Sequence, residues 1–253
     1  MMGTYVLTGG ATGIGAATKQ HLQDAGHRVI TVDIKDADYI ADLGDSVARE
    51  DVIGRIKGAH SSLDGLITCA GVASHFPDPA KIVAINFFGS QVLIAGLSDL
   101  MSSGARIVAI SSNSAPMCQN EALVEAMLSL DEDGAMSLAV GSDGHECYAG
   151  SKQAIARWMR KMAPEYAKRG IAFNAIAPGY IETPMTAAVA QDETYGDLIK
   201  EFVASIPIGR PGQPEDVANL ISFLLSPEGS YIAGSLIYCD GGHDAIMRPE
   251  GLY

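Results

Sequence analysis

The chain has 253 residues, of which 47% are apolar and 19% charged, a composition typical of one globular domain and not of a disordered chain. Its net charge of −13 argues against a nucleic-acid-binding protein, because phosphate backbones need a basic surface. The four cysteines and six histidines show no CxxC or HxxxH spacing, so the sequence predicts neither disulfides nor a bound metal. A first strand predicted from residue 4 leaves no room for a signal peptide, and no apolar stretch approaches membrane-span length. We therefore expect a cytoplasmic protein without membrane insertion.

Short apolar runs alternate with helical patterns along the chain, which is typical of parallel βαβ units. Strands are predicted at 4–8, 28–33, 39–42, 64–69, 105–111, 170–176 and 235–239. Helices are predicted at 13–25, 46–58, 80–103, 149–168, 191–204 and 214–226. Right-handed crossovers then give a single α/β domain over residues 1–253. The predicted fold is a Rossmann-type, doubly wound, parallel seven-stranded sheet in the order 3-2-1-4-5-6-7, with helices on both faces.

Two segments interrupt this alternation. Residues 113–147 are far longer than an ordinary βα connection, and part of them is amphipathic through Leu123, Val124, Met127, Leu128 and Leu130. This inserted segment is either a surface subdomain or a device that changes subunit packing or borders the substrate. Residues 181–206 follow the carboxyl end of a strand and are rich in apolar side chains, namely Met185, Val189, Tyr195, Leu198, Phe202 and Ile206. They form either ordinary helix core or a lid over the substrate.

A glycine-rich turn, TGGATGIG at 8–15, lies between the first predicted strand and the first helix. Glycines permit unusual backbone angles and let a pyrophosphate approach the N–H groups of the helix start, so this context favours a dinucleotide site. The second strand ends at Asp33, whose carboxylate can bind ribose hydroxyls and would repel a 2′-phosphate. Thr12 and Ile34 stand where a basic residue would receive that phosphate, and Lys35 lies slightly beyond. The sequence thus favours NAD over NADP.

A tyrosine and a lysine four residues apart, Tyr148 and Lys152, would lie on one face of the helix predicted to begin there. Such a pair is common by chance. It gains weight from Ser111-Ser112 and Pro178-Gly179, which end the fifth and sixth predicted strands. Both points lie along the carboxyl edge of a doubly wound sheet, where ligands bind.

Taken together, these motifs resemble those of the short-chain dehydrogenase/reductase family over nearly the whole chain. The matching residues are TGGATGIG at 8–15, Asp33, Asp42-Leu43, Cys69-Ala70-Gly71, Asn86, Ser112, Tyr148 with Lys152, Pro178-Gly179 with Thr183, and Asp240-Gly241-Gly242. The resemblance implies an NAD-dependent oxidoreductase that interconverts an alcohol and its ketone by hydride transfer.

The resemblance also implies roles for individual residues. Tyr148 would be the general acid/base, with its pKa lowered from about 10 by the Lys152 cation beside the positive nicotinamide. Lys152 would also hold the nicotinamide ribose. Ser112 would hydrogen-bond the substrate oxygen, with Ser111 as the alternative if the strand register is off by one. Asn86 would bind a water that links Lys152 to solvent, or would only satisfy a kink in its helix.

The remaining cofactor contacts follow from the same resemblance. They are Gly9, Thr12, Gly13 and Ile14 at the pyrophosphate; Asp33, Ile34, Asp42 and Leu43 at the adenosine; Ala70 and Gly71 beneath its ribose; and Ile181 and Thr183 at the carboxamide. One motif departs from the family pattern: Asn-Asn-Ala-Gly stands here as Thr68-Cys69-Ala70-Gly71. This change removes a side-chain hydrogen bond in the central sheet.

The long insert narrows the substrate class. Tyr148 lies 36 positions after Ser112, and this spacing, with segments 11–18, 32–38 and 240–249, resembles the bacterial 3α-hydroxysteroid dehydrogenase/carbonyl reductase subgroup. The expected substrate is a hydrophobic small molecule, a 3α-hydroxysteroid. The alternative is a cyclic monoterpene alcohol such as isopiperitenol, or another alicyclic or aryl alcohol. Expected pocket residues outside the lid are Met117, Cys118, His75 and Phe76.

Other functions fit the residues less well. A catalytically inactive dinucleotide-binding sensor predicts a damaged active site, yet Asn86, Ser112, Tyr148 and Lys152 are all present. A hydrolase would need a GxSxG elbow, which the sequence lacks. The resemblance further implies a homo-oligomer, a dimer or a tetramer. The insert would favour a dimer through the 214–226 helix and the C-terminal strand.

Overall fold

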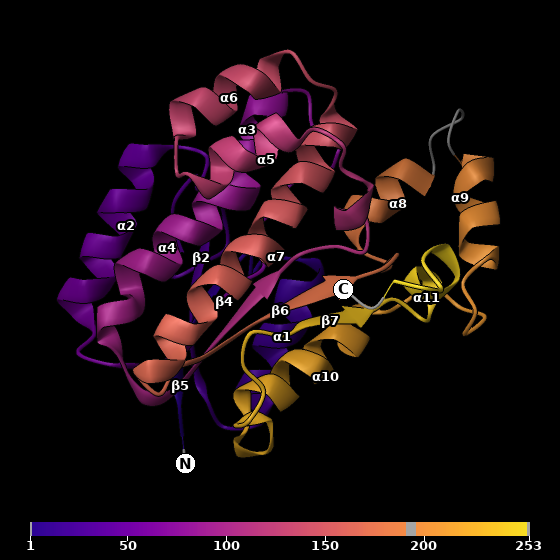
Figure 1. The fold of residues 1–253 in the computed structure, drawn as a ribbon. Coiled ribbons are helices and arrows are strands. Elements are labelled where there is room, and N and C mark those ends of the chain that lie inside the picture. The colour runs from indigo at the N-terminus through magenta and orange to yellow at the C-terminus, as the bar shows by residue number, and fades with distance from the viewer. Residues whose placement is uncertain (1, 191–195, 252–253) are drawn as a thin grey trace.

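The computed structural model describes residues 2–190 and 196–251. At its centre is a seven-stranded sheet in the order β3-β2-β1-β4-β5-β6-β7, in which every neighbouring pair is parallel (Figure 1). The strands are β1 (Thr4–Thr8), β2 (Arg28–Asp33), β3 (Tyr39–Ile40), β4 (Leu63–Thr68), β5 (Met101–Ile110), β6 (Ala172–Pro178) and β7 (Leu236–Cys239). The predicted fold class and strand order are confirmed.

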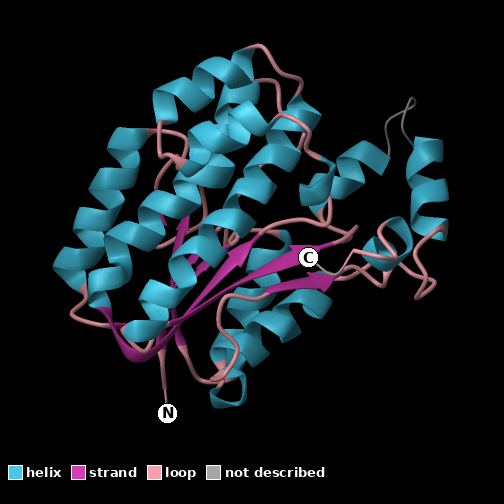
Figure 2. Cartoon of the chain, viewed as in Figure 1, coloured by secondary structure: helices cyan, strands magenta, loops and turns pink. Residues whose placement is uncertain are grey.

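Helices cover both faces of the sheet (Figure 2). On one face, α1 (Gly13–Asp24) packs against α10 (Pro214–Leu225). On the other lie α2 (Ser46–Ala59), α4 (Gly89–Leu97) and α7 (Gly144–Lys168). The shorter helices are α3 (Pro79–Val83), α5 (Glu121–Leu128), α6 (Glu132–Val140), α8 (Pro184–Ala190), α9 (Gly196–Ala204) and α11 (His243–Met247).

The continuously apolar strands supply two cores at once. Successive strand side chains point to opposite faces, so Val6 packs beneath α2, α4 and α7 while Leu7 packs beneath α1 and α10. Leu66 and Ile67 divide in the same way, and all four side chains are completely buried. With both faces of the sheet covered, the strand ends are where polar groups can gather.

The helix predicted at 80–103 is in fact several joined segments. α3 leads into a π-helical turn (Ala84–Phe88), then into α4 and a 3₁₀ turn (Ser98–Leu100), and β5 begins directly afterwards. By length and composition, Pro79–Leu100 is long and apolar enough to cross a membrane, so the prediction that no apolar stretch approaches membrane-span length was wrong. However, 72% of its apolar window is buried inside the fold, as in the core helix of a globular domain.

The inserted segment 113–147 forms a 3₁₀ turn (Ala115–Met117) followed by α5 and α6, which lie on α3 and α7. Leu123, Val124 and Met127 are buried beneath it, as the amphipathic pattern predicts. Leu130 is exposed instead, because it lies in the turn between α5 and α6 with a φ of 63°.

α7 also begins earlier than predicted, at Gly144 rather than 149. The Asp143 side chain caps the helix by accepting a hydrogen bond from the backbone N–H of Glu146. Tyr148 therefore lies within the helix and not at its start, which fixes its backbone more firmly.

Residues 181–206 contain two short helices, α8 and α9, where the sequence predicts one at 191–204. Figure 1 shows both beyond the arrowheads of β6 and β7, together with α11, which was not predicted. Phe202 of α9 packs on His243 of α11, with 4.4 Å between ring centroids. The predicted lid residues Val189, Tyr195 and Leu198 lie outside the residues whose side chains are described.

Candidate active site

A cavity of about 120 Å³ lies at the carboxyl ends of β4, β5 and β6. Three of the four predicted catalytic side chains, Ser112, Tyr148 and Lys152, line it. The other lining residues are Ile14, Cys69, Gly71, Val72, Ile110, Ser111, Pro178, Gly179, Ile181, Thr183, Met185 and Thr186. Strand ends, the start of α1 and a helix face thus converge on one small volume, as the sequence predicts.

Lys152 is fixed by its backbone surroundings. Its Nζ donates a hydrogen bond of 3.0 Å to the carbonyl oxygen of Ile110 at the end of β5, and it lies 5.7 Å from the centroid of the Tyr148 ring. The side chain is buried, and this burial lowers the pKa of the ammonium from 10.5 to about 8. The lysine is therefore held in place and loses its proton more readily than an exposed lysine.

The phenol of Tyr148 responds to burial in the opposite direction. Burial raises its pKa above the usual 10, and a hydrogen bond with Ser112 lowers it in part. The sequence predicts that Lys152 lowers this pKa, but with the protein atoms alone the pKa of Tyr148 is raised. A cation bound in the cavity would be needed to favour the phenolate.

The two adjacent serines of β5 have different partners. The Ser111 hydroxyl donates to the backbone carbonyl of Lys152 at 2.8 Å, so it joins β5 to α7. The Ser112 hydroxyl accepts from the backbone N–H and the hydroxyl of Ser114, at 3.2 and 2.9 Å, and it lies near the Tyr148 phenol. This geometry favours Ser112 over Ser111 as the serine that meets a substrate.

Asn86 lies in the π-helical turn and does not line the described cavity. Its side chain is buried and pairs with both backbone groups of Val72, accepting from the N–H at 2.8 Å and donating to the carbonyl at 3.0 Å. It also donates to the Ser151 hydroxyl at 3.3 Å. Asn86 therefore ties the Gly71-Val72 loop to α7, and its predicted water-binding role stays a prediction.

The glycine-rich turn fits a bound pyrophosphate. Gly9 and Gly13 have φ angles of 73° and 55°, which favour glycine, and a Cβ on Gly15 would collide with the carbonyl of Gly9. The N-cap residue Thr12 makes no side-chain capping bond in the described chain, and the first turn of α1 holds no acidic residue. The N–H groups of this helix start therefore remain suited to an anion.

The residues predicted to contact adenosine lie at the end of β2 and directly after β3. The Asp33 carboxylate accepts from the backbone N–H groups of Ala11 and Ile34, at 3.0 and 2.7 Å, so it faces the glycine-rich turn from the end of β2. Asp42 pairs with Lys81 at 3.4 Å on the surface. Leu43 differs from expectation, because its side chain is buried in the core and only its backbone can border a ligand.

Residues predicted to contact the ribose and the carboxamide lie next to the glycine-rich turn. A Cβ on Gly9 would lie 2.6 Å from the Ala70 nitrogen, so the glycine-rich turn touches the 69–71 loop directly. Gly71 and Ile181 line the cavity, and the Thr183 side chain lies 3.1 Å from the Cβ position of Gly13. The glycine-rich turn thus lies against both the 69–71 loop and Thr183.

The departure at Thr68 has a visible consequence. Among the described residues its hydroxyl is buried without a hydrogen-bond partner. Its neighbour in register on β1, Thr8, is equally buried, but the Thr8 hydroxyl accepts from the N–H of Ala70 at 3.1 Å. At the altered motif the described part of the central sheet therefore contains an unsatisfied buried hydroxyl.

Sequence reasoning missed some residues and misplaced others. Thr186 accepts from the backbone N–H of Thr183 at 2.9 Å and donates to the carbonyl of Ile181 at 2.7 Å, which closes the turn before α8. The spacing of Thr183 and Thr186, shortly after Pro178-Gly179, is the sequence feature that could have indicated this turn. Conversely, the described cavity is not lined by Met117, Cys118, His75 or Phe76.

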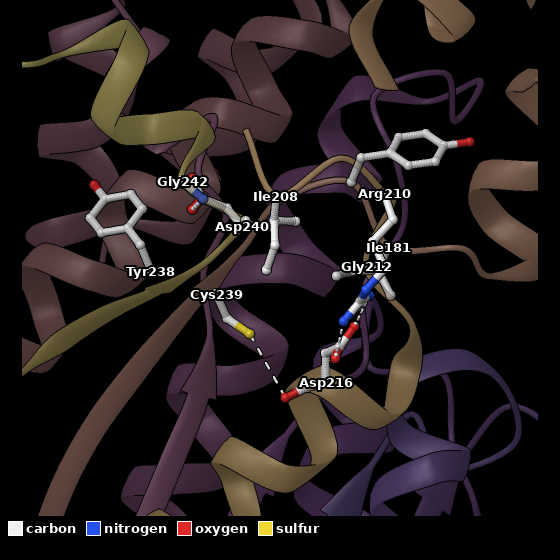
Figure 3. Close-up of a pocket in the computed structure, with 11 residues that line it drawn as sticks. Ile181, Ile208, Arg210, Gly212, Asp216, Tyr238, Cys239, Asp240 and Gly242 are labelled. Carbon is white, nitrogen blue, oxygen red and sulfur yellow. Dashed lines mark hydrogen bonds and ion pairs between the residues drawn. The ribbon is translucent and has the colours of Figure 1, made fainter. Parts of the chain in front are cut away.

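A larger cavity of about 220 Å³ lies next to this site (Figure 3). The Arg210 guanidinium pairs there with Asp216 through two hydrogen bonds of 2.6 and 2.8 Å. Of the described lining residues, Ile181 alone borders both cavities. Because neither Tyr148 nor Lys152 reaches the larger cavity, the smaller one is the candidate active site.

Comparison with known proteins places the chain among enzymes. A family model described as short chain dehydrogenase matches residues 4–124, and one described as Enoyl-(Acyl carrier protein) reductase matches residues 134–244. A 3-alpha-hydroxysteroid dehydrogenase/carbonyl reductase of Comamonas testosteroni is 37% identical over 98% of this chain and 99% of that protein. A cis-4-hydroxycyclohexanecarboxylate dehydrogenase of Sinomonas cyclohexanicum is 32% identical over 95% and 96%.

A solved structure agrees closely with the fold. The 3-alpha-hydroxysteroid dehydrogenase from Pseudomonas sp. B-0831, in complex with NADH, matches with a TM-score of 0.91 and 39% identity. The match covers 98% of this chain and all of that one.

Proposed function

Because the chain belongs to the short-chain dehydrogenase/reductase family and is an alcohol dehydrogenase or ketone reductase, we propose that Tyr148, Lys152 and Ser112 carry out its reaction. The observation that carries this proposal is the cavity that all three side chains line, next to the glycine-rich turn. A phenol, a buried amine and a hydroxyl meet there at the carboxyl edge of the sheet.

NAD is the proposed cofactor, and Asp33 disfavours NADP. Gly9, Thr12, Gly13 and Ile14 would hold its pyrophosphate, and Asp33, Ile34, Asp42 and Leu43 its adenosine. Ala70 and Gly71 would lie beneath the ribose, with Ile181 and Thr183 at the carboxamide. When bound, NAD⁺ supplies the hydride acceptor. The paired N–H bonds of Asp33 leave a fixed negative charge beside the ribose position, and this charge would repel a 2′-phosphate.

In the oxidation direction, the C–H hydrogen of the alcohol leaves as hydride and its O–H proton passes to Tyr148. Ser112 donates a hydrogen bond to the oxygen as it becomes a carbonyl. Lys152, together with the positive charge that a bound nicotinamide would bring, would favour the deprotonated phenol, and the bond from Lys152 to the Ile110 carbonyl holds the lysine in place for this. Ketone reduction is the reverse, with Tyr148 as the acid. Asn86 is a positioning residue that would also hold the proposed water.

The proposed substrate is a 3α-hydroxysteroid or a comparable hydrophobic secondary alcohol. Apolar side chains from three separate segments line the cavity, namely Ile14, Val72 and Met185, which suits an apolar ring system better than a sugar. The relatives that are named for a steroid support the first choice. The relative named for cis-4-hydroxycyclohexanecarboxylate supports the second choice, an alicyclic alcohol such as a cyclic monoterpene alcohol.

NADH absorbance on mixing purified protein and NAD⁺ with androsterone, isopiperitenol, an aryl carbinol and a sugar alcohol tests this function. Tyr148→Phe should lower turnover by about 10²–10⁴-fold, whereas the fully exposed Tyr231, changed to Phe, should not. Turnover of the smaller cyclic alcohols alone would move the substrate to the second choice. Turnover of sugars alone would refute the hydrophobic site, and NAD⁺ binding without any turnover would favour a sensor.

All four cysteines are free, which suits the expected reducing cytoplasm, and the location stays a prediction.

A further inference from the structure

The guanidinium of Arg49, on α2, is the meeting point of three separate parts of the fold. The side chain is 1% exposed. Its Nη1 donates to the backbone carbonyls of Leu43, at 2.9 Å, and Ala84, at 3.5 Å. Its Nη2 lies 2.6 Å from both carboxylate oxygens of Glu132. One buried cation thus binds two backbone segments and one acidic side chain.

The acidic partner comes from the inserted segment. Glu132 lies in the first turn of α6, where Asp131 caps the helix, and its side chain is 26% exposed. Among the described residues, Glu132 is the carboxylate that neutralises Arg49. Because a buried charge without a partner is costly, the position of Arg49 depends on the insert.

One backbone partner belongs to the proposed cofactor site, and the other begins a turn that supports it. Leu43 belongs to the turn after β3 that is proposed to border adenine. Ala84 begins the π-helical turn that carries Asn86, whose amide holds Val72 beside the cavity. Gly89, which directly follows the π-helical turn, packs on the same residue, because an added Cβ there would lie 3.1 Å from the Leu43 Cβ.

The outer side of the same turn is held more loosely. Lys81 reaches the Gly44 carbonyl at 3.2 Å and the Asp42 carboxylate at 3.4 Å, and both bonds lie at or near the surface. An ion pair exposed to water contributes little to stability. A buried charge-assisted hydrogen bond contributes more and restrains its partners more closely. Arg49 is therefore the stronger of the two restraints on the Asp42–Gly44 turn.

We propose that the insert supports the adenosine half of the cofactor site, with Glu132 acting through Arg49 as a positioning pair that sets NAD affinity. This inference rests on the proposed function, since it takes the Asp42–Leu43 turn as the adenine contact. This role of the insert differs from the two alternatives that the sequence left open, a change in subunit packing and a border to the substrate.

Binding of two ligands to a charge-removing variant tests the proposal. Glu132→Gln keeps the shape of the side chain but removes its charge. We expect its dissociation constant for NAD⁺ to rise about tenfold, with that for nicotinamide mononucleotide, which lacks adenosine, within about twofold of wild type. Titration calorimetry on both ligands measures this, and thermal melting records stability separately.

The control is Glu125→Gln, on the same insert. Glu125 pairs with Arg157 at 2.6 Å on the surface, so its loss should leave both dissociation constants unchanged. Glu132→Asp keeps the charge but shortens the side chain. Its dissociation constant for NAD⁺ should lie between those of wild type and Glu132→Gln. This variant keeps the test open if Glu132→Gln does not fold.

Two results would overturn the inference. One is an unchanged NAD⁺ affinity in both Glu132 variants, and the other is an equal loss of affinity for both ligands, which indicates general destabilisation. A wild-type protein that binds no NAD⁺ would instead refute the proposed function. The two failures are therefore distinguishable.

Discussion

The Ser111 hydroxyl donates a 2.8 Å hydrogen bond to the backbone carbonyl of Lys152, and so the end of β5 and the helix α7 are joined at the lysine itself. The bond is buried on both sides. It explains why two adjacent serines have different tasks, since Ser111 is used by the fold and Ser112 is left to face the cavity.

Substitution of each serine separates these tasks. Ser112→Ala should lower kcat by about 10²–10³-fold, because it removes a donor to the reacting oxygen. Ser111→Ala should lower the free energy of unfolding by about 1 kcal/mol, with a much smaller effect on kcat. Steady-state kinetics and urea unfolding of both variants measure the two effects. The reverse pattern would show that the roles are assigned the wrong way round.

Asp33→Asn should shift the cofactor preference towards NADP. Removal of the carboxylate abolishes its repulsion of the 2′-phosphate, and the ratio of kcat/KM for NAD to that for NADP should fall at least about tenfold. Asp36→Asn, an exposed neighbour in the same loop, is the control and should leave this ratio unchanged. An unchanged ratio in Asp33→Asn would place the selectivity elsewhere.

Lys152 should make stability depend on pH. Its pKa is lowered to about 8 by burial, so between that pH and its usual 10.5 the unfolded chain holds a proton that the folded chain has lost. The free energy of unfolding that Lys152 contributes should therefore rise with pH across this window. Urea unfolding of wild type and Lys152→Met at about pH 8 and about pH 10 measures this, since shared titrations cancel in the difference. A difference that stays constant would contradict the shift.

Thr8 and Thr68 form a matched pair for testing the altered motif. Both are 1% exposed and opposite each other in the sheet, but only Thr8 has a hydroxyl with a hydrogen-bond partner in the part of the chain described. Thr8→Val should destabilise the protein by about 1–3 kcal/mol, because it leaves the Ala70 N–H unpaired. Thr68→Val should be neutral or stabilise it by about 1 kcal/mol, because it removes an unpaired buried hydroxyl. Equal destabilisation by both would mean that Thr68 has a partner after all.

The chain should be a dimer in solution, with a mass of twice 26.5 kDa. On the α10 side of the molecule, Phe223 and Tyr231 are exposed, as an apolar contact between copies would require. Phe223→Glu should then give a monomer in sedimentation experiments. A wild-type monomer or tetramer would contradict the dimer, and a dimeric Phe223→Glu would move the interface.

Much of the candidate site could be predicted from short sequence motifs. A glycine-rich turn between a strand and a helix, a carboxylate at the end of the second strand, and a tyrosine four residues from a lysine each constrain geometry over a few residues only. Parallel strands then bring their carboxyl ends to one edge, which is why Ser112 shares a cavity with Tyr148 although the two lie 36 positions apart in the chain. The strand order follows from the same rules of crossover handedness.

Long-range packing determined the rest. No pattern in the chain shows that Glu132 reaches Arg49, 83 residues earlier, because that contact depends on how the insert settles on its neighbours. The direction of the Tyr148 pKa shift is likewise a matter of burial in the folded protein, and the turn at Leu130 breaks a helix that periodicity alone extends. Sequence patterns record what neighbouring residues prefer, whereas desolvation and contacts between distant segments exist only once the chain has folded.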